Sequence, residues 1–109
     1  MDEPEDNFFP ALAEKELKEG TMKLIWVEGT PILFIKQFGK IFAIDNRCPH
    51  QGCSFSSGTL DAKMIVCPCH EWRFDLETGE YENEPLMKLK KYDWKIESGK
   101  IYVKLDEDM

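Results

Sequence analysis

The residues of this chain that could bind a metal are gathered in two short segments. The sequence has four cysteines and two histidines, and all of them lie within RCPHQGCSF (47–55) and VCPCHEWRF (66–74). A tetrahedral zinc site is one use of such residues. Zinc fingers, however, usually take both cysteines from one segment and both histidines from the other. Here each segment mixes the two types, which favours an asymmetric centre with one metal bound by sulfur and another by nitrogen.

The two segments resemble those of the Rieske ferredoxins and Rieske domains. The likeness rests on CPHQG and on CPCHEWRFDLETGE, in which Cys48-x-His50 is followed, after a spacer of typical length, by Cys67-x-x-His70. It extends over about residues 8–105. The resemblance implies a [2Fe-2S] cluster whose inner iron is bound by Cys48 and Cys67 and whose outer iron is bound by His50 and His70. Neutral imidazoles donate less charge than thiolates, so such clusters are reduced more easily than all-cysteine ones.

The other two cysteines, Cys53 and Cys69, occupy positions that are joined by a disulfide in quinol-oxidising relatives. The resemblance therefore implies a disulfide that clasps the two segments, and a pair of free thiols beside the cluster is the alternative. Gly52 and Gly58 are expected to allow tight turns and a close approach of the backbone to the cluster.

The residues after the second histidine bear on the reduction potential. Quinol-oxidising relatives have hydroxyl side chains there that donate hydrogen bonds to the sulfurs and raise the potential. This chain has Glu71, Trp72 and Phe74 instead, which resemble the ferredoxins of oxygenase systems. We expect a low-to-middle potential, with both aromatic rings also packed beneath the segments.

The elements that must position these segments are short strands. Runs of β-branched and aromatic residues, separated by turns that contain glycine, predict an antiparallel meander over residues 21–27, 31–37 and 41–45. Further strands are expected over residues 63–67, 72–75, 86–96, with an interruption near Asp93, and 101–105. A short helix is expected within residues 11–20, ending at Gly20. The predicted fold class is all-β, a small antiparallel β-sandwich of Rieske type with two cluster-binding loops.

Charge and composition restrict the other classes of function. The formal net charge is −7, and no basic stripe exists, so nucleic acid is not an expected partner. No signal peptide or membrane span is recognised in the sequence, which predicts a cytoplasmic protein and no membrane association. Residues 1–7 and 106–109 are expected to be acidic tails around a single domain at 8–105.

These observations together predict an electron-transfer protein and not an enzyme in itself. A reductase is expected upstream, and an oxygenase or other terminal component downstream. Three alternatives stay open: a zinc-stabilised structural module, a small subunit of an oxidoreductase complex such as a nitrite reductase, and a redox sensor that uses Cys53 and Cys69.

Overall fold

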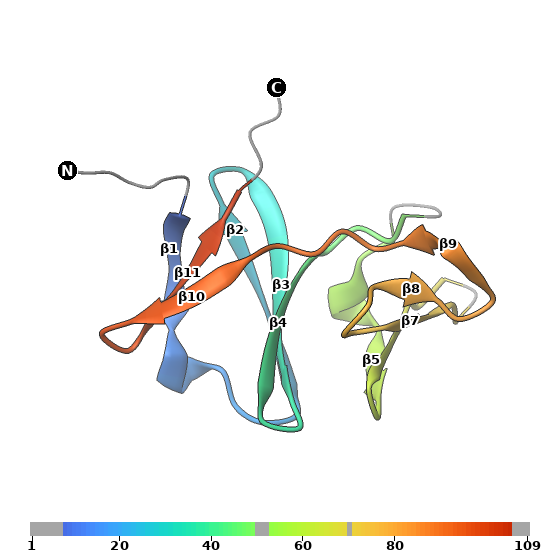
Figure 1. Ribbon diagram of the computed structural model, residues 1–109, viewed down its shortest axis with the longest axis horizontal. Coiled ribbons are helices and arrows are strands. Elements are labelled where there is room, and N and C mark those ends of the chain that lie inside the picture. Colours follow the sequence, from blue (N-terminus) through green and yellow to red (C-terminus); the bar gives the residue numbers. More distant parts are fainter. Residues whose placement is uncertain (1–7, 50–52, 70, 106–109) are drawn as a thin grey trace.

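The structure, a computed structural model, describes residues 8–49, 53–69 and 71–105 (Figure 1). The tails expected at residues 1–7 and 106–109, together with residues 50–52 and 70, lie outside this range. The strands of the first half are β1 (Phe8–Ala13), β2 (Thr21–Val27), β3 (Thr30–Gln37) and β4 (Lys40–Asp45). Those of the second half are β5 (Thr59–Asp61), β6 (Met64–Val66), β7 (Arg73–Asp75), β8 (Glu80–Tyr81), β9 (Glu84–Lys88), β10 (Trp94–Glu97) and β11 (Lys100–Lys104).

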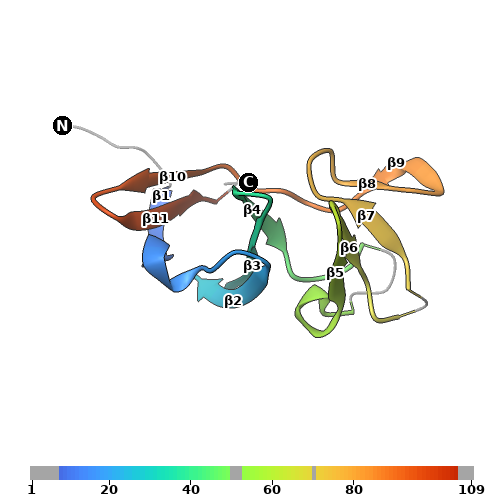
Figure 2. The same cartoon turned by 90° about the horizontal axis from the view of Figure 1, so that it is seen from below.

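The strands form three antiparallel sheets, which confirms the predicted all-β class. Two sheets, with the orders β1-β11-β10 and β2-β3-β4, make up a base, and the third has the order β5-β6-β7-β8-β9. The second of these sheets is the predicted meander. The five-stranded sheet stands to one side of the base in both views, and its whole sequence lies between β4 and β10 (Figures 1 and 2). The cysteine-containing segments therefore belong to an insertion into the base.

The predicted helix at 11–20 is wrong. Residues up to Ala13 continue strand β1, and only a single 3-10 turn, η1 (Glu14–Glu16), follows. Pairing of β1 with β11 gives the backbone hydrogen bonds that a helix would have supplied, and a helix of this length is marginal in isolation. Gly20 does end the segment, in a left-handed conformation with φ of +77°.

Strand β3 separates two hydrophobic cores. Leu33 and Ile35 point into the core shared with the five-stranded sheet, whereas Ile32 and Phe34 point into the core of the base. Successive residues of a strand face opposite sides, so this strand is buried on both faces. No helix in the described part of the chain is long and apolar enough to cross a membrane.

Candidate metal centre

The first loop (residues 46–54) leaves the end of β4 and is anchored at both sides by Asn46. The backbone oxygen of Asn46 accepts a hydrogen bond from Phe55 N (2.8 Å), and its side-chain Oδ1 accepts one from Ser56 N (2.8 Å). Inside the loop, Cys48 N donates to the backbone oxygen of Cys53 (2.8 Å). Asn46 is buried, and these two hydrogen bonds satisfy its backbone oxygen and its Oδ1.

A buried carboxylate fixes the start of the first loop. Asp45 Oδ1 accepts hydrogen bonds from Arg47 N and Arg47 Nε (both 2.9 Å), and Oδ2 accepts from Arg47 Nη2 (2.8 Å) and Tyr92 Oη (3.1 Å). Burial opposes the negative charge of Asp45, but the hydrogen bonds from Arg47 and Tyr92 outweigh it and hold the pKa of this carboxyl below its ordinary value. The ionised carboxylate therefore ties the loop to the segment after β9.

The second loop (residues 67–72) connects β6 to β7 and is closed at its base. Cys67 N donates to the backbone oxygen of Trp72 (2.7 Å), directly beyond the ladder pair Val66 and Arg73. Phe74 is fully buried, and Trp72 is half-buried and packs on the same core. Both aromatic residues thus pack beneath the loops, as the sequence suggested.

A disulfide joins the two loops. Cys53 of the first loop is bonded to Cys69 of the second, and their Cα atoms are 6.3 Å apart. Of the four cysteines, these two are consumed in a cross-link, which leaves Cys48 and Cys67 outside the disulfide.

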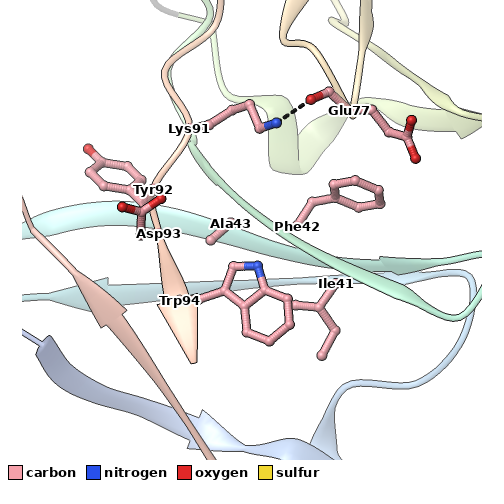
Figure 3. Close-up of a pocket in the computed structure, with 8 residues that line it drawn as sticks. All are labelled: Ile41, Phe42, Ala43, Glu77, Lys91, Tyr92, Asp93 and Trp94. Carbon is pink, nitrogen blue, oxygen red and sulfur yellow. Dashed lines mark hydrogen bonds between the residues drawn. The ribbon is translucent and has the colours of Figure 1, made fainter. Parts of the chain in front are cut away.

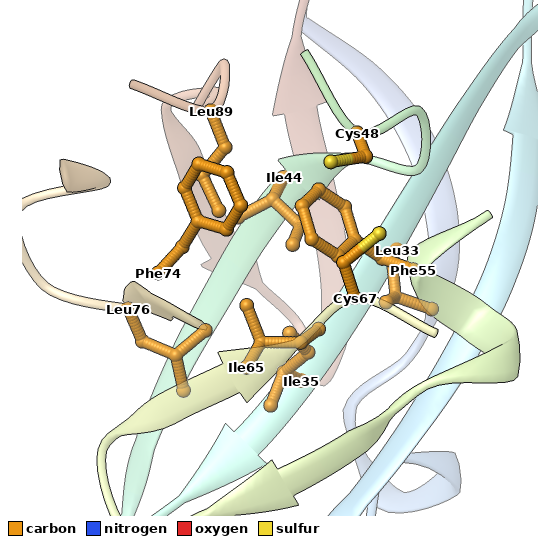
Figure 4. Packing of buried hydrophobic residues seen from close by; sticks show 10 residues of the cluster. All are labelled: Leu33, Ile35, Ile44, Cys48, Phe55, Ile65, Cys67, Phe74, Leu76 and Leu89. Atoms are coloured by element: carbon orange, nitrogen blue, oxygen red, sulfur yellow. The ribbon is translucent and has the colours of Figure 1, made fainter. Parts of the chain in front are cut away.

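Cys48 and Cys67 lie at one end of the core beneath the loops. Their side chains come from the two different loops and are almost entirely buried, with exposed fractions of 2% and 0% (Figure 4). Figure 4 shows them on the side of the core away from Leu76. His50 and His70 lie outside the described residues, so their positions are not part of this geometry. The donors that can be placed, two buried thiols on cross-linked loops, fit the thiolate half of a [2Fe-2S] centre with mixed ligands.

The chain just before β5 passes so close to the end of β6 that Gly58 must lack a side chain. A Cβ atom added to Gly58 would lie 2.0 Å from the backbone oxygen of Val66, the residue before Cys67. Gly58 therefore allows a close approach to the backbone of Val66; its approach to the cluster stays a prediction, and Gly52 is outside the described residues.

A cavity of about 500 Å³ lies elsewhere, between β4 and β10. Figure 3 shows Phe42 and Trp94 beside it, with Lys91 Nζ donating a hydrogen bond to the backbone oxygen of Glu77. None of the residues that line it belongs to either loop. Its lining residues include no cysteine or histidine.

Comparisons with known proteins agree with this geometry. The family model of the Rieske [2Fe-2S] domain matches residues 7–93. This chain belongs to the Rieske [2Fe-2S] domain family. Its cofactor is accordingly a [2Fe-2S] cluster, and the zinc module considered from the sequence is set aside.

Several relatives of this Rieske domain are ferredoxin components of oxygenase systems. The chain is 35% identical over 101 residues to the ferredoxin component of the naphthalene 1,2-dioxygenase/salicylate 5-hydroxylase systems of Ralstonia sp., covering 92% of this chain and 97% of that one. It is 32% identical over 92 residues to the ferredoxin component of the alkene monooxygenase system of Xanthobacter autotrophicus, covering 84% and 75% respectively. The solved structure of a Sphingomonas yanoikuyae B1 ferredoxin superposes with a TM-score of 0.81 at 25% identity, covering 92% of this chain and all of that one.

Sequence reasoning missed the residues that hold the loops from outside. Asp45, Asn46 and Tyr92 were not recognised, and neither was Tyr81, which packs on Trp72. Two polar residues directly after the strand IFAI were the available signal for Asp45 and Asn46. No local signal marked the tyrosines, because their partners are distant in the sequence.

Proposed function

We propose that this Rieske domain is a soluble, cytoplasmic one-electron carrier whose cluster is bound by Cys48, His50, Cys67 and His70. The observation that supports the ligand assignment best is that two of the four cysteines form a disulfide and the other two do not. Cys53 and Cys69 cross-link the loops, and Cys48 and Cys67 are buried between them. The two histidines complete the donor set of the family motif.

The cluster would take up and release one electron at a time. Bound at this site, a [2Fe-2S] cluster supplies the redox chemistry, and the mixed ligands give potentials of about −150 to +300 mV. The chain's own contribution is to bury the two cysteines and fix both loops. With Glu71 and Trp72 after His70, we place the potential below about +150 mV, in the lower part of that range.

The direct test is the metal content of the purified protein. We expect a reddish-brown protein that contains iron and acid-labile sulfide in equal amounts and gives an electron paramagnetic resonance (EPR) signal after reduction. Cys48→Ser should abolish that signal, whereas Cys53→Ser, the matched control from the same loop, should retain it. A colourless protein that contains zinc would contradict the proposal.

We propose a reductase as the electron donor and an oxygenase or related terminal oxidoreductase as the acceptor. Support comes from relatives that are components of dioxygenase and monooxygenase systems. The net charge of −7 favours partners with a basic docking surface. Electron transfer to such a partner should slow as ionic strength rises, because salt screens the attraction. A rate that does not depend on salt would exclude charge steering.

A further inference from the structure

Four aromatic rings form a continuous row beneath the two loops. The rings of Trp72 and Tyr81 are stacked, with centroids 4.1 Å apart and planes inclined by 4°. Tyr81 also contacts Phe74, at 5.4 Å between centroids, and Phe74 meets Phe55 edge to face at 5.5 Å. The row therefore runs from the second loop, through the core, to the residue that follows the first loop.

Like Phe74, Tyr81 belongs to a strand of the five-stranded sheet and lies outside both loops. It lies in β8, directly opposite Phe74 of β7 in the antiparallel ladder, and its own strand continues through a hairpin into β9. The five-stranded sheet thus holds the Tyr81 ring in place independently of the loops. A ring fixed in this way can act as a platform for the flat face of Trp72.

Trp72 links this platform to a proposed ligand. Its indole lies on Tyr81, while its backbone oxygen accepts the hydrogen bond from Cys67 N (2.7 Å). Cys67 is fully buried, so its position depends on the backbone that closes the loop. If the Trp72 indole shifted on the Tyr81 ring, the backbone oxygen of Trp72 would move with it. The hydrogen bond from Cys67 N would then be displaced, together with the loop that it closes.

We propose that Tyr81 is a positioning residue for the cluster, acting through its stack with Trp72 to hold the second loop in the geometry that binds iron. The inference rests on the proposed function, since it presumes that Cys67 and His70 are ligands. The ring and not the hydroxyl performs this role. Within the described residues, the hydroxyl receives a long hydrogen bond of 3.4 Å from Asn83 Nδ2, in an exposed position.

The experiment compares Tyr81→Leu with Tyr81→Phe in the full chain with its cluster bound. Tyr81→Leu removes the stack, and we expect the cluster to be lost to an iron chelator about fivefold faster, the factor that one aromatic pair can account for. The EPR g values and the reduction potential should shift as well. Tyr81→Phe keeps a ring on Trp72 and should match the wild type in all three measurements.

Tyr102→Leu is the matched control, because it removes a half-buried tyrosine from β11, in the base. It should leave the g values and the chelator rate unchanged. Combining Trp72→Leu with Tyr81→Leu should have no larger effect than either change alone, since both remove the same stack. If Tyr81→Leu does not fold, as judged by circular dichroism, Trp72→Phe provides the test, because a smaller ring on the platform should give an intermediate chelator rate.

Three results would overturn the inference. One is a Tyr81→Leu protein with wild-type g values and chelator rate; another is a Tyr81→Phe protein as impaired as Tyr81→Leu. The third is equal acceleration in Tyr102→Leu, which would indicate a general loss of stability. Failure of the proposed function is distinguishable from all of these, because the wild-type protein itself would then contain no iron and no sulfide.

Discussion

Glu71 brings a negative charge to the second loop, between His70 and Trp72. Its side chain is exposed, and its backbone adopts a left-handed conformation with φ of +55°. A negative charge near the cluster disfavours the reduced state, which is itself more negative. We therefore expect the charge of Glu71 to lower the reduction potential.

We predict that Glu71→Gln raises the midpoint potential by about 20–60 mV, the effect of a unit charge at a largely solvated site. Protein-film voltammetry measures it. Glu28→Gln is a close control, because Glu28 is also exposed and left-handed (φ +50°) but lies in the β2–β3 turn. Equal shifts in both variants, or none in either, would contradict a local effect of Glu71.

Gly58 supports the second loop through its lack of a side chain. Gly58→Ala would place Cβ against the backbone oxygen of Val66, and we predict a loss of about 2 kcal/mol or more in the free energy of unfolding. Gly29→Ala serves as comparison. Gly29 has φ of +82° with no atom within 4 Å of the added Cβ, so only backbone strain of about 1 kcal/mol is expected. Thermal or urea unfolding of both variants should show the larger loss at Gly58.

Among the elements, the two loops depend on each other through the disulfide. Cys53 and Cys69 are separated by 16 positions, and opening a ring of this size removes about 3 kcal/mol of stability in the chain-entropy model. We predict this loss for the double variant Cys53→Ser/Cys69→Ser, together with faster loss of the cluster to a chelator.

The wild-type protein treated with a thiol reductant is the natural control, since it should behave like the double variant. Mass spectrometry of the untreated protein after alkylation should find Cys53 and Cys69 unmodified. Alkylation of both in the native protein would show that the clasp is open under those conditions.

The elements that were predicted correctly are those whose signals are local. Strands β2, β3 and β4 are long, apolar and separated by glycine turns, and the cysteine–histidine spacing is contained in two short segments. Strands β5 and β8 were missed, because three and two residues carry too little periodicity to be recognised. Strand β1 was missed because its pairing partner, β11, is at the other end of the described chain.

The same reason explains the gaps in the predicted site. The sequence marked the residues that could bind iron, but not the residues that hold them. Asp45 meets Tyr92 across 47 positions, and Trp72 meets Tyr81 only after a turn and a strand. Such contacts depend on which strands and segments pair with one another, which no local pattern specifies.

At the scale of the whole molecule, Asp45 joins the base to the chain that returns from the insertion. Its pKa is held below the ordinary value of about 3.8, so its contribution to stability is complete above that value. The contribution is lost as pH falls through the lower pKa of the folded state.

We predict that Asp45→Asn lowers the free energy of unfolding by about 1–3 kcal/mol at pH 7. The gap to the wild type should narrow as pH falls below about 3.8. Urea unfolding followed by circular dichroism at pH 7, 5 and 3 measures this difference in stability. The control is Asp93→Asn, because Asp93 is exposed. A gap of constant size across this range would show that the carboxylate charge is not what stabilises the connection.

The pairing of β1 with β11 sets an order of events during synthesis. Phe8 lies opposite Lys104 in this ladder, so the base cannot close until translation has passed β11. Cys48, Cys53, Cys67 and Cys69 leave the ribosome earlier, while the sheet that will support them still lacks its final strands. Of these four, Cys48 and Cys67 are buried and outside the disulfide in the finished protein, so on a nascent chain their thiols are accessible to oxidation before the base has closed.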